Sequence, residues 1–339
     1  MIPQRREANL ADTDTRFAIA PRQTLLDAAL AAGIPWHSGC RVGLCGSCRC
    51  RVEKGRVRAL TDFSRVLDAQ SLERGYVLAC RSVAESDLTV APDQLIGIAQ
   101  QADHPAIVAT CRPLAPTVLE LELELEQPLE RGYRAGQYAR LEVPGQVPGR
   151  CFSFAGACRG DTRLRFLVRV FPGGKFSDWL VGTDRRGQSL TVSRPLGEFT
   201  LAEDDRPVLL ICAGTGLAPA MAMVEELVGD PRRRPPLRLV YAARDRDYLY
   251  WQERLEALGR DWPQPFEFVP VLSREAPDSG WTGLRGHVHD HLESLTSGFT
   301  DARAYLCGPA GLVDFVELSL VKLGWPRTSI RADRFLAAF

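Results

Sequence analysis

The stretch Gly39–Cys50, GCRVGLCGSCRC, brings three cysteines together at the spacing Cys40-x4-Cys45-x2-Cys48, and a further cysteine, Cys80, follows downstream. This is the plant-type spacing for a [2Fe-2S] cluster, in which a tight loop presents three thiolates and a distant thiolate completes the ligand set. Glycines in the loop let backbone N–H groups approach the cluster sulfides. A structural zinc site or buried free cysteines are the alternatives, but zinc sites usually pair their ligands as two CxxC units. The spacing therefore predicts Cys40, Cys45, Cys48 and Cys80 as cluster ligands.

The composition is that of a globular protein. The chain has 339 residues, a formal net charge of zero, 45% hydrophobic residues and 25% charged residues. This length predicts two or three domains, and the neutral balance gives no reason to expect nucleic-acid binding. The first residues lack the pattern of a secretory signal, so we expect a cytoplasmic protein with no transmembrane segment. The uncharged stretch Pro207–Val224 is punctuated by glycines and a proline, which predicts a strand, a turn and a helix.

Residues 1–92 are predicted to form one domain around the cysteine loop. Thr24 stands three residues before Asp27, a capping-box spacing for a helix over Leu25–Ala32. Polar and apolar residues alternate from Arg49 to Glu53, which predicts a strand whose Cys50 side chain faces inward. Cys80 follows an apolar run, as expected for a ligand beside a buried strand. Residues 93–104 have the character of a linker.

Residues 105–205 are rich in strand signals. In Val118–Glu126 four leucines alternate with four glutamates, which predicts a strand with one face buried and the glutamates outward. Shorter alternating segments follow at Gln137–Val143, Leu164–Val170 and Ser189–Val192. Several short strands at regular spacing predict a small antiparallel barrel.

Residues 206–339 change in character. Apolar runs at Val208–Ala213, Leu237–Ala243 and Phe266–Leu272 alternate with helical segments such as Leu217–Val228 and Leu312–Leu323. This alternation predicts a parallel α/β sheet covered by helices on both faces.

A glycine turn follows the first of these apolar runs and reads Gly214-Thr215-Gly216-Leu217-Ala218-Pro219. Such a turn lets backbone amides and the positive end of a helix meet a dinucleotide pyrophosphate. It departs from the GxGxxG fingerprint because Pro219 stands where the third glycine would be. Glycine turns between a strand and a helix are also common for packing reasons alone.

A second set of candidate residues lies in the barrel region. Arg150-Cys151-Phe152-Ser153 supplies an arginine fork, and Gly173-Gly174-Lys175-Phe176-Ser177 supplies a glycine pair that enters a short helix. Together they could hold a second pyrophosphate; separately they could be a turn and an exposed arginine. Near the end of the chain, Cys307-Gly308-Pro309 terminates a strand, where open parallel sheets place their ligands.

These motifs, in this order, resemble the ferredoxin–NADP reductase superfamily, and within it the fused reductases that feed electrons to bacterial oxygenases. The likeness extends over the whole chain and is greatest to reductases of xylene monooxygenase systems, with those of naphthalene and benzoate dioxygenases also similar. It implies an N-terminal β-grasp plant-type ferredoxin domain, an FAD-binding barrel and an NAD-binding α/β domain. The family motifs RxYS, GGxxS and GGTGLAP correspond to the segments beginning at Arg150, Gly173 and Ala213.

The resemblance also implies residue roles. Arg150 would bind the FAD pyrophosphate, Phe152 would lie on the isoalloxazine, and Ser153 would hydrogen-bond near flavin N5. Cys307 would lie near the nicotinamide, so Ser153 and Cys307 are the expected catalytic residues. An aromatic residue of the tail, Phe335 or Phe339, would cover the flavin. The remaining expected FAD contacts are Cys151, Val168, Val170, Gly173, Gly174, Lys175 and Ser177. The expected nicotinamide-dinucleotide contacts are Gly214, Thr215, Gly216, Leu217, Pro219, Arg244, Gly308 and Pro309.

The implied function joins these domains. NADH delivers two electrons at once, a [2Fe-2S] cluster accepts one at a time, and a flavin can mediate between them. The expected partner is a terminal oxygenase or hydroxylase, including a membrane-embedded di-iron hydroxylase, which would place the chain at the membrane through its client. The alternatives are a Rieske aromatic-ring dioxygenase or a deoxysugar dehydratase as client, or a redox carrier or sensor that does not turn over.

Three further groups of residues also support predictions: charged residues after a strand, a run of histidines and four additional cysteines. Asp245 and Asp247 offset Arg244 and Arg246 after the strand ending near Ala243, which predicts NADH over NADPH. The pattern His287-x-His289-x-His291 is predicted to be structural, at a helix entry that scatters the rings. Four further cysteines are predicted to be small buried apolar residues: Cys111, Cys151, Cys158 and Cys212.

The segment around the cysteine loop is basic although the whole chain is neutral. Between positions 41 and 58 the one acid is Glu53, against six basic residues: Arg41, Arg49, Arg51, Lys54, Arg56 and Arg58. This pattern predicts either a solvated strand face or a docking surface for an acidic client or an anionic membrane.

Overall fold

The computed structural model describes residues 5–34, 36, 43, 46–64, 66–93, 104–299 and 301–335. Several predictions fall outside this range, namely those for Cys40, Arg41, Cys45, Phe339 and most of the linker. The chain divides into two compact units, Met1–Gln101 and Ala102–Phe339. In the described part of the chain no helix has the length and apolar character needed to cross a membrane.

The first unit is built on a five-stranded sheet in the order β2-β1-β7-β3-β5. These strands are Arg16–Ile19, Arg6–Leu10, Leu88–Pro92, Arg49–Lys54 and Tyr76–Leu78, respectively. A small sheet pairs β4 (Val57–Ala59) with β6 (Ser82–Ala84), and the helical segments are α1 (Leu25–Ala31), α2 (Ala69–Glu73) and the 3-10 turn η1 (Ala79–Arg81). The Thr24 hydroxyl accepts a hydrogen bond from the Asp27 backbone N–H at 3.1 Å, which confirms the predicted cap. Cys50 is fully buried in the core of this unit, as predicted.

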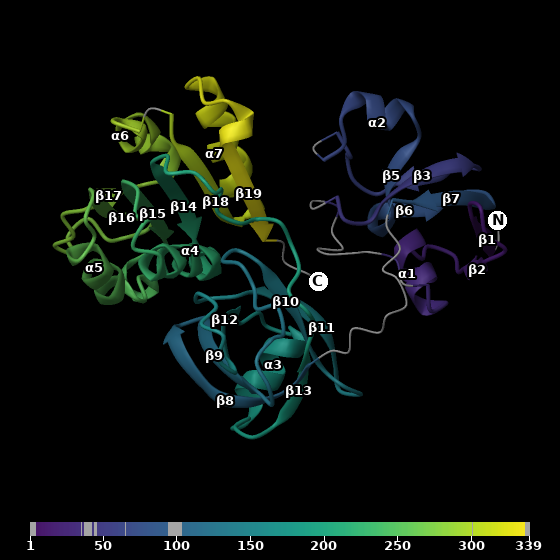
Figure 1. The fold of residues 1–339 in the computed structure, drawn as a ribbon, viewed down its shortest axis with the longest axis horizontal. Coiled ribbons are helices and arrows are strands. Elements are labelled where there is room, and N and C mark those ends of the chain that lie inside the picture. Colours follow the sequence, from purple (N-terminus) through teal and green to yellow (C-terminus); the bar gives the residue numbers. More distant parts are fainter. Residues whose placement is uncertain are drawn as a thin grey trace. The chain divides into compact units, whose positions relative to one another are not determined.

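The second unit begins with an antiparallel sheet in the order β11-β10-β13-β8-β9-β12. These strands are Val147–Ser153, Tyr138–Val143, Ser189–Val192, His104–Ala115, Val118–Leu125 and Arg163–Arg169, respectively. The sheet closes on itself through a bridge between Phe154 and Phe166, where the Ala155 N–H donates to the Arg165 carbonyl at 2.8 Å. The predicted barrel is therefore confirmed, with helix α3 (Lys175–Gly182) beside it (Figure 1).

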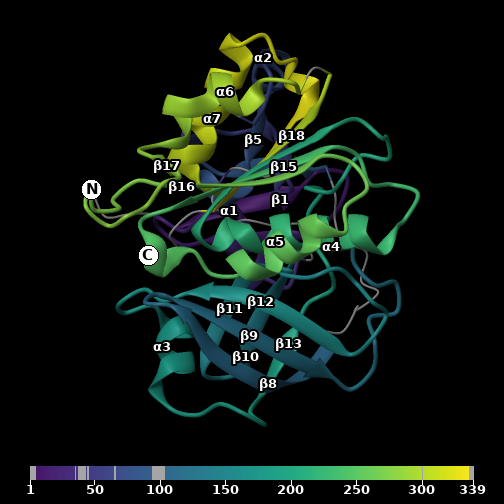
Figure 2. The same cartoon turned by 90° about the vertical axis from the view of Figure 1, so that its left-hand side faces the viewer.

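A parallel sheet in the order β17-β16-β15-β14-β18-β19 follows the barrel. These strands are Leu284–Arg285, Phe266–Leu272, Leu237–Ala243, Val208–Ala213, Arg303–Pro309 and Ile330–Phe335, respectively. Helices α4 (Leu217–Gly229) and α5 (Gln252–Arg260) cover one face, and α6 (Leu292–Thr296) and α7 (Ala310–Lys322) cover the other (Figure 2). Alternate residues of β14 explain this: Leu210 and Cys212 join the core with α4, while Leu209 and Ile211 join the core with α6 and α7.

The barrel and the parallel sheet share one of these cores. Buried barrel residues such as Val118, Leu167 and Leu201 belong to the same apolar cluster as Met223 of α4 and Tyr305 of β18. Gly136 shows how closely the parts approach, because a Cβ there would lie 2.7 Å from the Met223 Cε atom. The barrel and the parallel sheet therefore pack as one body.

The alternating strand β9 departs from the prediction at one residue. Glu120 was expected to face outward, but it is 1% exposed and its carboxylate pairs with Arg112 of β8 and Arg165 of β12. Its neighbours lie on flanking strands, so a pattern within β9 could not reveal them. The cysteine prediction is also wrong in part, since Cys212 is buried but Cys111 and Cys158 are half-buried and Cys151 is exposed.

Candidate functional site

Two of the predicted cluster ligands come together in the first unit. Cys48 precedes β3 and Cys80 lies in η1, and the Cys80 N–H points to the Cys48 sulfur at 3.5 Å. Both residues are nearly buried, at 3% and 4% exposure. Thiolates shielded from water and reached by backbone N–H groups fit an iron–sulfur cluster. Within the described residues they form no larger metal-ligating group, and the roles of Cys40 and Cys45 stay predictions.

Gly43 of the cysteine loop has a positive φ of 84°, and a Cβ there would lie 2.7 Å from Arg81 Cγ. The side chain next to Cys80 thus packs against the loop. Cys50 is different in kind, because burial and then the neighbouring Cys48 raise the pKa of its thiol well above the ordinary value. Cys50 therefore stays protonated in the core.

The basic segment near this loop is less uniformly charged than the sequence predicts. Arg49 forms an ion pair with Asp93 and lies over the Tyr76 ring at 4.9 Å, and Arg51 pairs with Glu53. Asp93 was outside the segment counted, which is why its charge was missed. Arg56 and Arg58 are exposed and have no ion-pair partner in the described part of the chain.

The two segments predicted to bind FAD lie next to each other in the barrel. The Phe152 ring of β11 is 4.9 Å from the Phe176 ring at the start of α3. Arg150 is half-exposed, and its side chain has no hydrogen-bond or ion-pair partner among the described residues, so its guanidinium is available to an anion. Ser153 is 8% exposed, and Val168 faces the barrel core.

The glycine pair before α3 makes a tight turn. Gly173 has a positive φ of 77°, and a Cβ on Gly174 would lie 2.7 Å from the Ser177 hydroxyl. That hydroxyl accepts from the Phe171 N–H at 3.2 Å and donates to the Gly174 carbonyl at 3.0 Å. Ser177 therefore shapes the turn, which leaves the amides at the start of α3 beside exposed Lys175.

The predicted dinucleotide turn interlocks with the end of strand β18. A Cβ on Gly216 would lie 2.3 Å from the Cys307 carbonyl oxygen, and one on Gly308 would lie 2.9 Å from the Ala213 carbonyl oxygen. The Cys307 thiol donates to the Gly216 carbonyl at 3.1 Å, and burial raises its pKa well above the ordinary value. Cys307 is thus a neutral thiol buried against the turn. The Tyr250 hydroxyl also stabilises the turn, because it donates a hydrogen bond to the Gly214 carbonyl oxygen at 2.6 Å.

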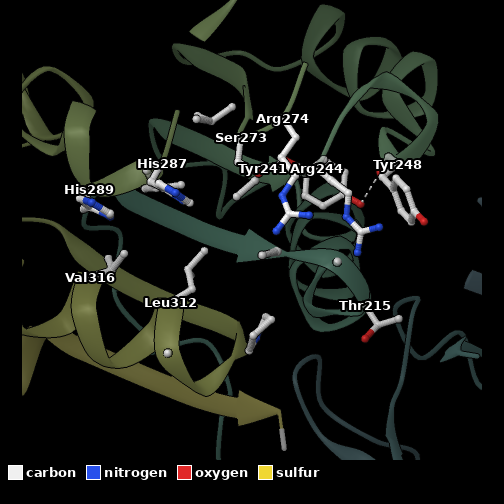
Figure 3. Close-up of a pocket in the computed structure, with 18 of the residues that line it drawn as sticks. Thr215, Tyr241, Arg244, Tyr248, Ser273, Arg274, His287, His289, Leu312 and Val316 are labelled. Atoms are coloured by element: carbon white, nitrogen blue, oxygen red, sulfur yellow. Dashed lines mark hydrogen bonds between the residues drawn. The ribbon is translucent and has the colours of Figure 1, made fainter. Parts of the chain in front are cut away.

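A cavity of about 420 Å³ opens at the carboxyl ends of the parallel strands, where such sheets bind ligands. It is lined by Gly214 and Thr215 of the turn, by Arg244, Ser273 and Arg274, and by barrel residues including Val118 and Arg169. Arg244 and Arg274 extend side by side toward the cavity from the ends of β15 and β16 (Figure 3). None of the described lining residues is acidic, which suits a ligand that carries phosphates.

The histidine prediction needs correction. Val288–His291 is a 3-10 turn, η4, in which the His287 and His289 rings stack with centroids 5.3 Å apart and planes 5° apart. Both rings line the cavity (Figure 3), and His289 also packs on Phe315 of α7 at 4.3 Å. The predicted helix entry is present, because η4 leads directly into α6. The predicted scattering is wrong for His287 and His289, because their rings stack at this tight turn.

The reason given for a preference for NADH also needs correction. Asp245 accepts a hydrogen bond from the Asp247 N–H at 3.1 Å, and neither aspartate lines the cavity. Arg246 pairs with Glu275, so only Arg244 of the four charged residues reaches the site. Two lining residues, Ser273 and Arg274, were not predicted from the sequence. Their position directly after strand β16 was the available signal.

The last strand of the parallel sheet ends next to a residue of this site, Pro309. Phe335 is the last residue of β19 and pairs with Pro309 of β18 in the sheet. The choice between Phe335 and Phe339 as the aromatic that covers a flavin stays open, because Phe339 is outside the described residues.

Comparisons with known proteins match each part of this architecture. Family models described as a 2Fe-2S iron-sulfur cluster binding domain, an oxidoreductase FAD-binding domain and an oxidoreductase NAD-binding domain match residues 8–85, 106–201 and 210–318. The chain is an oxidoreductase with iron–sulfur, FAD-binding and NAD-binding domains.

Relatives match almost end to end. The xylene/toluene monooxygenase electron transfer component of Pseudomonas putida is 36% identical, with 94% of this chain and 91% of that protein covered. The toluate 1,2-dioxygenase electron transfer component of Pseudomonas putida is 32% identical, with 96% and 97% covered. The solved structure of the ferredoxin reductase in carbazole 1,9a-dioxygenase has a TM-score of 0.69 at 26% identity, with 98% and 99% covered. The chain belongs to the fused iron–sulfur flavoprotein reductases of the ferredoxin–NADP reductase superfamily.

Proposed function

We propose that this chain is the reductase component of an oxygenase system and delivers electrons from NADH to a terminal oxygenase. The observation that carries the proposal is the cavity at the strand ends, formed by the interlocked Gly216 and Cys307 loops and by barrel residues such as Val118 and Arg169. One cavity thus borders both nucleotide-binding parts. When bound, FAD accepts the two electrons of a hydride and releases them singly, and the [2Fe-2S] cluster carries one at a time.

Residues in each part of the chain would bind one of the three redox groups. Gly214 and Thr215 line the cavity just before α4, where the turn would hold the pyrophosphate of the dinucleotide. Arg150 and the turn at Gly173 and Gly174 would hold the FAD pyrophosphate, with Phe152 against the ring system. Ser153 would hydrogen-bond the flavin, and Cys307 would support the nicotinamide side from beneath the turn. In the first unit, Cys48 and Cys80, together with Cys40 and Cys45, would ligate the cluster.

The client is proposed to be a monooxygenase of the hydroxylase class, embedded in the membrane. The 36% identity to a monooxygenase component supports a monooxygenase as the client, and the 32% identity to a dioxygenase component supports a dioxygenase as the second candidate. The chain would then act in the cytoplasm and reach the membrane only through its client.

Anaerobic mixing with NADH tests the proposal. The purified protein should contain iron and FAD, and NADH should bleach first the flavin and then the cluster absorbance. A protein with iron and no flavin, or one that NADH leaves oxidised, would instead be a carrier or sensor. Electron delivery to membranes that contain a monooxygenase, compared with delivery to a soluble dioxygenase, then distinguishes the two clients.

A further inference from the structure

A carboxylate is buried where helix α4 meets the barrel. Glu225 lies on α4, and its side chain is 7% exposed. One carboxylate oxygen accepts a hydrogen bond from the backbone N–H of Ala157 at 3.2 Å, and the other lies 3.7 Å from Arg165 of β12. The same carboxylate forms an ion pair with Arg254 of α5. Glu225 therefore joins the barrel to the helix that begins at the dinucleotide turn.

Neighbouring groups make this junction specific. Glu226 accepts a hydrogen bond from the Ala135 N–H of the barrel at 2.8 Å, so both glutamates of α4 bind barrel backbone. Arg165 also lies 3.2 Å from buried Glu120, which ties the junction to strand β9. Gly156 fits closely, since a Cβ there would lie 3.2 Å from the Glu225 carboxylate.

Stability alone is a poor explanation for a charge at this place. The junction already buries apolar side chains, among them Leu167, Leu201 and Met223. Buried ion pairs commonly add little stability compared with apolar residues of similar size, whereas their hydrogen bonds are directional and select one geometry. The charged groups facing Glu225 are Arg165, Arg254 and, at 4.0 Å, Arg159. Burial lowers the pKa of Arg254, and the attraction of Glu225 opposes that shift.

We infer that Glu225 is a positioning residue for hydride transfer, which aligns the dinucleotide turn with the flavin site by fixing the tilt of α4 on the barrel. This inference rests on the proposed function. About 14 Å of helix separates Glu225 from Gly216 at roughly 1.5 Å per residue, so a tilt of about 4° moves the turn by about 1 Å. A displacement of that size is enough to cost up to about 100-fold in rate. In the step concerned, a hydride leaves NADH and is accepted by FAD, giving NAD⁺ and two-electron-reduced flavin.

Glu225→Gln tests this inference, because glutamine keeps an acceptor for the Ala157 N–H but cannot form the ion pairs. We expect flavin reduction at saturating NADH to slow about tenfold, with unchanged FAD content and a larger primary isotope effect with C4-deuterated NADH. Amide exchange should rise in two peptides, one spanning residues 214–217 and one containing Ala157. Glu253→Gln, at an exposed glutamate in the first turn of α5, is the matched control and should change neither measurement.

Flavin reduction within twofold of wild type in folded Glu225→Gln, together with unchanged amide exchange, overturns the inference. If that variant does not fold, Arg165→Lys keeps a positive charge beside Glu120 but loses the guanidinium fork, and it should slow flavin reduction in the same way; an unchanged rate overturns the inference. If wild-type flavin is not reduced by NADH, the proposed function fails. In that case amide exchange can still be compared between wild type and Glu225→Gln, because it needs no turnover. The comparison then decides whether Glu225 fixes the position of the turn.

Discussion

Cys48 and Cys50 are two residues apart, are both buried, and have opposite expected roles. The Cys48 sulfur faces the Cys80 backbone N–H, while Cys50 is packed in the core of the sheet with a raised thiol pKa. A thiolate ligand and a neutral core thiol are chemically different, although the sequence shows the same letter.

The pair supplies a matched experiment. We expect Cys48→Ser to remove the visible and electron paramagnetic resonance signals of the cluster. NADH-dependent reduction of ferricyanide should stay within about twofold of wild type, because that acceptor takes electrons at the flavin. Cys50→Ser should retain the cluster and lose only about 1–3 kcal/mol of unfolding free energy through its buried hydroxyl. Loss of ferricyanide reduction in folded, flavin-loaded Cys48→Ser would contradict the order of carriers, and loss of the cluster in Cys50→Ser would contradict the assignment.

Arg274 is the residue at which coenzyme choice can be examined. It lines the cavity beside Arg244, and none of the described lining residues is acidic. A ribose 2′-phosphate would therefore meet positive charge, whereas sites that favour NADH place an acid near the ribose hydroxyls. The preference of the protein for NADH over NADPH stays a prediction. The two aspartates on which that prediction was based do not line the cavity.

We expect Arg274→Ala to lower kcat/KM for NADPH about tenfold, since a charge-assisted contact contributes about 1.5–3 kcal/mol. The value for NADH should change by less than about twofold, so NADH serves as the control. Steady-state kinetics with both coenzymes give the comparison. An equal loss with both would show that Arg274 binds a group the two coenzymes share.

Helix α4 has a glycine at each end, and the two glycines differ in the space that surrounding atoms leave for a side chain. A Cβ on Gly216 would lie 2.3 Å from the backbone carbonyl of Cys307, whereas one on Gly229 would meet nothing within 4 Å. The first glycine allows two loops to interlock, and the second only occupies the last turn of the helix.

We predict that Gly216→Ala displaces the turn and slows NADH-dependent flavin reduction by about 100-fold, with FAD still bound. Gly229→Ala should leave that rate unchanged and raise the unfolding free energy by up to about 1 kcal/mol, because alanine is the better helix former. Stopped-flow absorbance and thermal unfolding measure the two effects. A Gly216→Ala protein that NADH reduces at the wild-type rate would contradict the proposed site for the dinucleotide.

Elements with local signals were predictable from the sequence, and contacts between distant elements were not. Strand Val208–Ala213 and the turn after it follow from an apolar run between Pro207 and Gly214, and the structure gives the same bounds. The burial of Glu120 depends on Arg112 and Arg165 of flanking strands, which periodicity within one strand cannot report. The stacked pair His287 and His289 was missed for a different reason: the stack is local, but the sequence did not distinguish a 3-10 turn from the first turn of an α-helix.

The charged residues are unevenly distributed along the chain, although its formal net charge is zero. In the first unit Arg49 and Arg51 have acidic partners, whereas Lys54, Arg56 and Arg58 of the same basic segment are exposed and have no ion-pair partner in the described part of the chain. The last two, Arg56 and Arg58, are the arginines available to attract a client. They lie at strand β4, which pairs with β6 directly after Cys80 and Arg81. Electrostatic steering toward a client would therefore act near a predicted cluster ligand.

We predict that Arg56→Glu with Arg58→Glu slows electron delivery to the native client about tenfold at low salt and leaves ferricyanide reduction unchanged. Wild-type delivery should fall as salt is added, because the screening length is only about 8 Å at physiological ionic strength. Arg16→Glu with Arg22→Glu provides a control with the same change in net charge, at exposed positions in and just after the edge strand β2. Equal effects of the two double variants would point to net charge and not to a docking surface.

The core shared by the barrel and the parallel sheet has a practical consequence for dividing the gene. A fragment that begins near His104 keeps that core whole and should express as a stable NADH-oxidising flavoprotein without iron. A fragment ending near Asp205 would instead expose Val118, Leu167 and Leu201 to water and should aggregate. Grafting a foreign iron–sulfur module ahead of residue 104 is therefore the natural way to redirect this protein to another client, and recombination between barrel and parallel sheet is not.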